Sequence, residues 1–192
     1  MNRNVWLLFT CQAMVNAAGI CQVAMSALIG YTLSPAKGLA TLPYALQMIG
    51  TMAAAIPASM LFARLGRRVG FVAGALSMLT GTLVLLLGVW RADFVIYCIG
   101  ALPLGVGFGI GQHYRFAASE VAAPAARARA IALVMAGGVV SAIFGPEILI
   151  HTKNWLAPVL FSGTYVALLL LPLISLMLIA VIDLPPAPKR VV

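Results

Sequence analysis

Long apolar stretches, separated by short segments with charges, prolines or glycines, run through the whole chain. Six of them lie at about 5–31, 42–62, 69–90, 94–116, 130–150 and 156–182. Because about 20 mainly apolar residues are enough for a helix to cross the hydrocarbon core of a bilayer, the pattern predicts a bundle of six transmembrane helices in residues 1–184. The proline-rich residues 185–192 are predicted to be a tail and the start of a linker.

The composition agrees with a chain that lies almost entirely in a lipid bilayer. Hydrophobic residues make up 63% of the sequence and charged residues 8%, whereas a soluble domain carries about 25% charged residues. The net charge of +8 comes from cations scattered singly between the apolar stretches, which excludes nucleic acid as a partner. The sequence therefore predicts an all-α, multi-pass membrane protein without a soluble domain.

Lysine and arginine are distributed unequally between the two ends of the predicted helices. One side carries Arg3, Arg64, Arg67, Arg68, Arg115, Arg127, Arg129, Lys189 and Arg190, and the other carries Lys37, Arg91 and Lys153. Short loops with more lysine and arginine face the cytoplasm. This bias predicts a protein of the cell (inner) membrane with both termini, including the tail at 185–192, in the cytoplasm.

The six predicted helices differ in the residues that they offer to their neighbours. Stretches 69–90 and 156–182 are rich in leucine, whereas the other four contain the glycines and most polar side chains. Helices in a membrane approach each other through small residues, while bulky aliphatic side chains suit lipid. We therefore expect the third and sixth helices at the periphery and the other four around an interior. The three-helix period predicts two related triplets.

Three short motifs accompany these helices. The segment SMLFARLGRR at 59–68 places a basic run in a loop between the second and third helices; its basic run contains Arg64, Gly66, Arg67 and Arg68. The segment EVAAPAARARA at 120–130 follows the fourth helix and contains Glu120, Arg127 and Arg129. The fifth helix contains the pair Gly145-Pro146.

In this order and between these helices, the motifs resemble the major facilitator superfamily over its N-terminal six-helix half. That family commonly has G-x-x-x-D-R-x-G-R-R after helix two and E-x-x-x-P-x-x-R-x-R-A after helix four, and a glycine-proline element in helix five is prominent among its antiporters. The resemblance implies one half of a twelve-helix bundle that moves a solute by alternating access. It also implies a gradient as the energy source and the arginine loop as a cytoplasmic hinge or latch.

The chain departs from the family pattern at several positions. Ser59 stands in place of the leading glycine, and Ala63 stands in place of the acid that helps tie this loop to the other half of the family's transporters. The arginine that the family usually has within helix four is absent, since Ala101 and Pro103 occupy that region. These departures remove support for the usual latch and for the usual proton-coupling element.

Polar side chains are scarce in the predicted helices, so each is a candidate for a role inside the bundle. Gln12 and Asn16 share one helical face, and Gln47 and Thr51 form a similar pair on the second helix. Two interpretations stay open: a neutral lining of a substrate cavity, or interhelical hydrogen bonds that average about 0.6 kcal/mol. Gln112, near the cytoplasmic end of the fourth helix, is a further substrate-binding candidate.

Glu147 is the acid that lies well inside a predicted helix, directly after Gly145-Pro146. An acid in lipid costs roughly 2.5–3.5 kcal/mol on insertion scales, so we expect it to face a cavity or a partner, and His151 follows on the same face. A proton or cation coupling site and a carboxylate wetted from the outer surface both fit. Arg115 is expected to reach the interface or to pair with Glu120, with contact to an anionic substrate as the alternative.

Motifs for catalysis or for metal or nucleotide binding are not found. Cys11, Cys21 and Cys98 lie within apolar stretches and lack metal-ligand spacing. We therefore expect neither an enzyme nor a bound cofactor.

The sequence thus predicts half of a secondary transporter for a small organic solute, and the neutral polar residues favour an amphipathic or neutral solute. Since such transporters need two six-helix halves, we expect a second half or a second copy of the chain as partner. The alternative is a non-transporting membrane protein or truncated remnant that acts only as an assembly partner.

Overall fold

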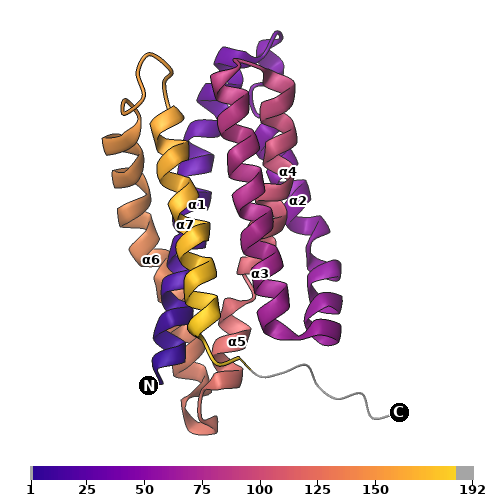
Figure 1. Cartoon of the computed structure of the whole chain (residues 1–192), viewed down its shortest axis with the longest axis vertical. Helices are drawn as coiled ribbons and strands as arrows, with labels where there is room; N and C mark the ends of the chain where they lie inside the picture. The colour runs from indigo at the N-terminus through magenta and orange to yellow at the C-terminus, as the bar shows by residue number, and fades with distance from the viewer. Residues whose placement is uncertain (1, 185–192) are drawn as a thin grey trace.

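The protein is a bundle of long helices in the computed structural model, which describes residues 2–184 (Figure 1). In chain order the helices are α1 (Arg3–Leu33), the 3-10 turn η1 (Lys37–Leu39), α2 (Leu42–Ala53), α3 (Ala55–Trp90), α4 (Phe94–Gly111), α5 (Tyr114–Val121), the 3-10 turn η2 (Pro124–Ala126), α6 (Arg127–Thr152) and α7 (Ser162–Val181). Strands are absent from the described residues. The predicted tail at 185–192 lies outside them.

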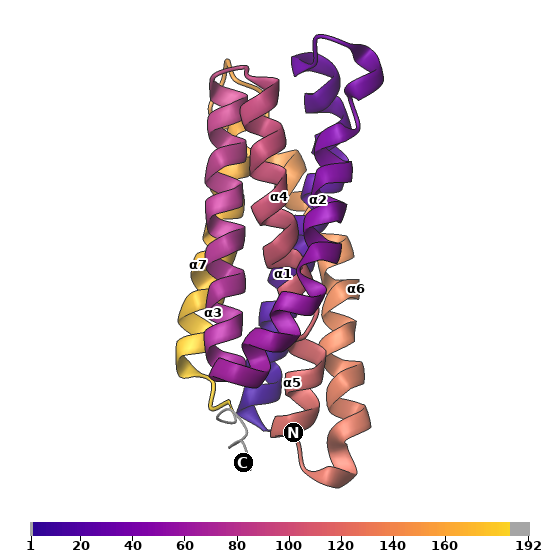
Figure 2. The ribbon, with the colours of Figure 1, turned by 90° about the vertical axis from the view of Figure 1, so that its right-hand side faces the viewer.

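The chain makes six passes because α3 reverses direction within its length (Figure 2). Gly66 has φ 86° and ψ 167°, a conformation that a residue with a Cβ rarely adopts. Five helical stretches are long and apolar enough to span a membrane, and the one from Lys37 to Trp90 contains this reversal. The fold class, an all-α membrane bundle, is the one predicted, but the arginine-rich loop is a single-residue turn between helical segments.

Helix packing follows the predicted relation between the two triplets. Helix α1 packs along α6, and α4 packs along α2. Superposing the first three passes on the last three places α1 on α4 and α2 on α6. The α1–α6 contact is then equivalent to the α4–α2 contact. The second limb of α3 packs against α7, which joins the third passes of both triplets. This arrangement is the one expected of an internal repeat in a transporter bundle.

The second pass is interrupted where the sequence predicted one continuous helix. Helix α2 ends at Ala53 and α3 begins at Ala55. Pro57 explains the break, because it has no N–H to donate to the carbonyl of Ala53 and its ring crowds that carbonyl. The resulting bend is visible between α2 and the first limb of α3 in Figure 2.

Two predicted boundaries were wrong. The sixth helix begins at Ser162 rather than near Leu156, since residues 153–161 form turns that include Pro158. The segment after residue 116, predicted as a long loop, continues as α5 to Val121. Its small residues are the reason: Ala117 and Ala118 are completely buried, and α5 packs against α1 and α6.

Both ends of the described chain lie at the same end of the bundle (Figure 1). The amide of Asn4 donates to the carbonyl of Asp183 at 3.3 Å, and the amide of Asn2 donates to the carbonyl of Val121 at 3.2 Å. The even number of passes requires this arrangement, and these bonds close the end that carries most of the arginines.

Candidate functional site

A cavity of about 620 Å³ opens on one side of the bundle between four of the passes. Its lining comes from α1, α2, α4 and α6, and is formed by Asn16, Gly19, Ile20, Val23, Ala24, Tyr44, Gln47, Met48, Phe108 and Gly138. The volume is within the range of about 300–1,000 Å³ that small-molecule sites occupy. The leucine-rich second limb of α3 and helix α7 contribute none of these residues, as the sequence pattern predicts for peripheral helices.

A cluster of amides fixes the side chain of Asn16 at the wall of this cavity. Gln12 Nε2 on the preceding turn of α1 and Gln112 Nε2 at the end of α4 both donate to Asn16 Oδ1 at 3.2 Å. Gln12 is 3% exposed, so it supports Asn16 from behind and does not line the cavity. The predicted candidates Gln12, Asn16 and Gln112 are therefore brought together, with Asn16 as the member at the cavity.

The close approach of α2 and α4 sets the position of Gln47. The backbone of Gly105 packs directly on the carbonyl of Gln47, where a Cβ would not fit. The Thr51 hydroxyl lies 3.0 Å from the carbonyl oxygens of both Gln47 and Gly105. Thr51 thus links the two helices, as in the interhelical interpretation, while Gln47 lines the cavity and is 1% exposed.

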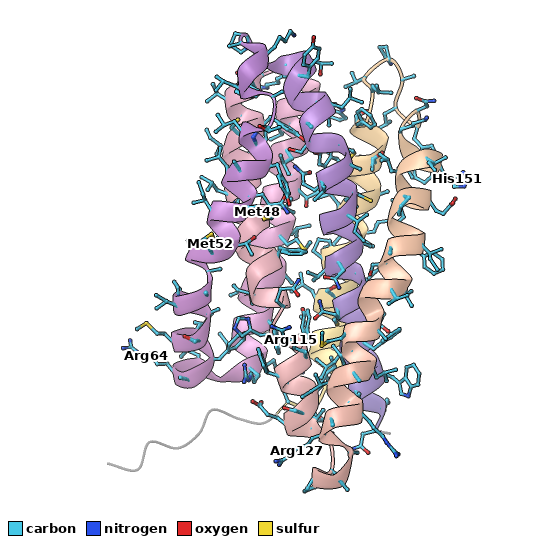
Figure 3. All side chains as sticks on the ribbon, turned by 180° about the vertical axis from the view of Figure 1, so that it is seen from behind. Met48, Met52, Arg64, Arg115, Arg127 and His151 are labelled. Atoms are coloured by element: carbon cyan, nitrogen blue, oxygen red, sulfur yellow. The ribbon has the colours of Figure 1, made fainter. Side chains whose placement is uncertain are left out.

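Aromatic and thioether side chains form the apolar walls. The Cε2 edge of the Phe108 ring lies against α1 at Gly19, where an added Cβ would be 2.5 Å from Cε2. Met48 and Met52 lie one turn apart on α2 (Figure 3); Met48 lines the cavity, whereas Met52 is 76% exposed. The sequence analysis did not select Phe108, Tyr44 or Met48, because apolar residues in an apolar helix carry no signal of their own.

The arginine turn is held to α5 by an ion pair. Arg67 donates through Nη2 to Glu120 at 2.6 Å and through Nε at 3.1 Å, and its guanidinium carbon lies 4.7 Å from the centre of the Phe62 ring. Arg68 hydrogen-bonds the carbonyl of Ala180 at the end of α7. The turn therefore ties three helix ends together within this chain.

Of the two expectations for Arg115, reaching the interface or pairing with Glu120, the pairing is not seen, because Arg67 pairs with Glu120. The guanidinium of Arg115 instead lies 4.9 Å from the ring centre of Phe116, and its Nε is buried without a partner among the described residues. In Figure 3, Arg115 lies below Met48, toward the end of the bundle where Arg64 and Arg127 project. Arg64, Arg127 and Arg129 are exposed.

Glu147 and His151 pair with each other on the outside of α6. His151 Nε2 lies 3.1 Å from Glu147 Oε2, and the two side chains are 73% and 56% exposed, respectively. Figure 3 shows His151 directed away from the bundle. Neither residue lines the cavity, so any contact that they make with a partner lies on the outer face of α6.

The small residues of α6 pack on α1. The Ser141 hydroxyl lies 2.7 Å from the carbonyl oxygen of Ala13, and the thiol of Cys21 lies 3.1 Å from that of Gly145. Gly145 belongs to this contact and packs against Ile20, but neither Gly145 nor Pro146 lines the cavity. Gly138, about two turns earlier, does line it.

A second buried polar cluster lies between α1, α4 and α7. The hydroxyls of Tyr97 and Tyr165 are 2.7 Å apart, and Tyr165 donates to Gln22 Oε1 at 2.8 Å. All three residues are completely buried. The sequence analysis missed this cluster, since only the fold brings these passes together; the signal was the presence of an amide and two tyrosines within apolar stretches.

Comparison with known proteins agrees with this architecture. No family model matches the chain. Among curated proteins, the riboflavin transporter RfnT of Brucella anthropi is 32% identical over 187 residues, which is 97% of this chain and 47% of that protein. The chain therefore spans about half the length of the curated relative that it matches.

Solved structures show the same relation. The xylose transporter XylE from E. coli, in a partially occluded inward-open conformation, matches with a TM-score of 0.80 at 14% identity over 96% of this chain and 50% of its own. The major facilitator superfamily transporter FucP, in an outward conformation, matches with a TM-score of 0.76 at 14% identity over 94% of this chain and 50% of its own.

The fold and the hydropathy define the chain as a multi-pass helical membrane bundle. More particularly, it has the fold of one six-helix half of the major facilitator superfamily transporters that it resembles, as the motifs predicted.

Proposed function

We propose that this chain forms one half of a secondary transporter that moves a small organic solute by alternating access. The observation that carries the proposal is the cavity of about 620 Å³ between α1, α2, α4 and α6, which is open on one side of the bundle. An open cavity on a half-bundle is expected where the second half supplies the opposite wall of a central site. The cavity has no catalytic arrangement, so transport is favoured over an enzymatic role.

The relative is named a riboflavin transporter, and the cavity chemistry fits a solute of that kind. Phe108, Tyr44 and Met48 offer flat or adaptable apolar surface, and Asn16 and Gln47 offer neutral hydrogen-bonding groups. No charged residue lines the cavity. These features favour a neutral, planar, amphipathic solute, with riboflavin as the first compound to test.

The outer faces of α2, α3 and α6 favour a second bundle as partner. Met52 and Ile56 are 76% and 73% exposed, and Val139 and Ile143 on α6 are 68% and 65% exposed. These apolar side chains come from the two sides of the cavity. A second six-helix half that covers them would also close the cavity. We favour a separate second half over a second copy of this chain, because the curated relative is about twice as long as the segment that matches.

The orientation proposed from the lysine and arginine bias is both termini in the cytoplasm of the inner membrane. The grouping of Asn4, Asp183 and the arginine turn at one end of the bundle supports it. Fusions of alkaline phosphatase after Leu184 and after Lys37 provide the test. Alkaline phosphatase activity is expected only for the fusion after Lys37, which would lie outside the cytoplasm. Activity of the fusion after Leu184 would reverse the assigned orientation.

Glu147 and His151 are proposed as the coupling pair, on the outer face of α6. Their mutual contact of 3.1 Å supports a shared proton or cation. Glu147→Gln is expected to reduce gradient-driven accumulation while leaving solute exchange intact. Glu120→Gln is a matched control, since it removes an acid at the opposite end of the bundle. Equal accumulation by both variants would contradict the coupling role.

The central test is riboflavin uptake into proteoliposomes that contain this chain with a co-expressed second six-helix half. Uptake that depends on both polypeptides is the expected result. Association without flux of any solute would favour the alternative of a non-transporting assembly partner.

A further inference from the structure

Two side-chain amides in the cavity lining, one on α1 and one on α2, have groups that are available for hydrogen bonds to a ligand. The first is Asn16, whose Oδ1 already accepts from Gln12 and Gln112. With the oxygen held on that side, the Nδ2 group is directed toward α6. It lies 3.2 Å from the place where a Cβ would stand on Gly138. Because position 138 is glycine, this donor faces the cavity and not a side chain.

The second amide is Gln47. It is 1% exposed, and its Oε1 is buried without a hydrogen-bond partner among the described residues. A buried carbonyl oxygen without a donor is unfavourable, and an amide can turn about its terminal bond to present either of its groups. The backbone of Gln47 is fixed by Gly105 and Thr51. The side chain is therefore the part that is free to meet a donor in the cavity.

The space between these amides has apolar surfaces for a flat molecule. The Phe108 ring contacts Gly19 through its Cε2 edge, and this close contact restricts how far the ring can move. Tyr44 and Met48 lie on the α2 side. A charged ligand has no counter-charge in the lining, which argues against phosphorylated compounds.

We propose that the cavity recognises the edge of a neutral heteroaromatic ring that has a carbonyl group adjacent to an N–H. The carbonyl accepts from Asn16 Nδ2 and the neighbouring N–H donates to Gln47 Oε1, with the ring face against Phe108. This inference rests on the proposed function, because it names the recognition chemistry of the same site. In a flavin, the matching group is the pyrimidinedione edge with its N3–H.

The test measures binding by quenching of flavin fluorescence, using the purified chain in lipid nanodiscs. The probes are lumiflavin, which has the ring system without the ribityl chain, and N3-methyl-lumiflavin, which lacks the N–H. Lumiflavin is expected to bind. The methyl compound is expected to bind at least about 10-fold more weakly, because without the N3–H the Gln47 Oε1 atom has no donor. Flavin mononucleotide is expected not to compete.

Gln47→Leu is expected to remove the preference, so that both lumiflavins bind alike within about 2-fold. Asn154→Leu removes an exposed amide from a turn outside the cavity and should keep the preference. If Gln47→Leu does not fold, the comparison of the two probes on the unaltered chain still decides. Equal binding of both probes overturns the inference and leaves flavin transport standing. Absence of binding by lumiflavin and riboflavin alike overturns both.

Discussion

At the scale of single residues, the hydroxyl of Tyr165 makes completely buried polar contacts between three helices. It lies between Tyr97 and Gln22, each completely buried. Water does not reach these groups, so a lost hydrogen bond there is not replaced from solvent. Interhelical hydrogen bonds in membranes are nevertheless modest, with an average of about 0.6 and a maximum of about 1.7 kcal/mol. The cluster therefore fixes the relative positions of α1, α4 and α7 more than it adds stability.

Tyr165→Phe tests this. We expect the free energy of unfolding to fall by about 1 kcal/mol, because the change leaves Gln22 Oε1 without its donor and Tyr97 without its partner. Thermal unfolding followed with a thiol-reactive dye is suited to the chain, since Cys11, Cys21 and Cys98 are buried until it unfolds. Tyr31→Phe, at a residue that is 52% exposed, is the matched control. Identical midpoints for both variants would show that the cluster contributes nothing.

At the scale of elements, glycines decide how closely α2 and α4 approach. Gly105 and Gly109 face the backbone of α2, at Gln47 and Thr51 respectively. Small residues let neighbouring helices in a membrane approach closely, and these two glycines do so here. This contact also holds Gln47 at the cavity, so packing and site depend on the same two residues.

Gly105→Ala is expected to destabilise the bundle by about 1–3 kcal/mol, because the new methyl group meets a backbone carbonyl that cannot move aside alone. It should also weaken riboflavin binding by displacing Gln47. Gly38→Ala is the control, because nothing lies within 4 Å of its added Cβ. Both variants are compared in the same thiol-dye assay, and a Gly105→Ala chain as stable as Gly38→Ala would contradict the packing argument.

How much the sequence predicts also depends on the element. Hydropathy places the passes well, because each must cross about 30 Å of hydrocarbon. It is silent on the interruption at Ala54, which lies among apolar and small residues. It also does not place the break between α4 and α5, because Gln112 and His113 lie within the stretch 94–116 that it predicts as one helix. For the site, polar scarcity selected Asn16 and Gln47. It could not select Phe108, whose role arises from its contact with Gly19 on another helix.

The ion pair between the arginine turn and α5 belongs to the same scale. The side chains of Arg67 and Glu120 are 21% and 38% exposed, so the Coulomb term is partly screened and Glu120→Gln should cost less than about 1 kcal/mol. Arg67→Ala should cost more, because it also removes the packing on Phe62. Arg64→Ala, at an exposed arginine of the same turn, is the control. Equal costs for Arg67→Ala and Glu120→Gln would assign no role to the Phe62 contact.

At the scale of the whole molecule, the bundle has two kinds of apolar surface. Met177 is 70% exposed on α7, a helix that contributes nothing to the cavity lining, and lipid is expected to cover it. Met52, at 76%, lies on α2 beside the open cavity. Both would contact lipid in an isolated half, but a second bundle that completes the site has to cover the Met52 side.

Single cysteines at these two methionines distinguish the surfaces. The native cysteines are buried, so a cross-linker added to membranes reacts with the new thiol first. We expect Met52→Cys to form a covalent complex with the second half when the two polypeptides are co-expressed, and Met177→Cys to stay monomeric. A product of twice the mass of this chain would instead identify a homodimer. Equal cross-linking at both positions would mean that the bundle has no preferred partner face, and the half-transporter proposal would lose its structural basis.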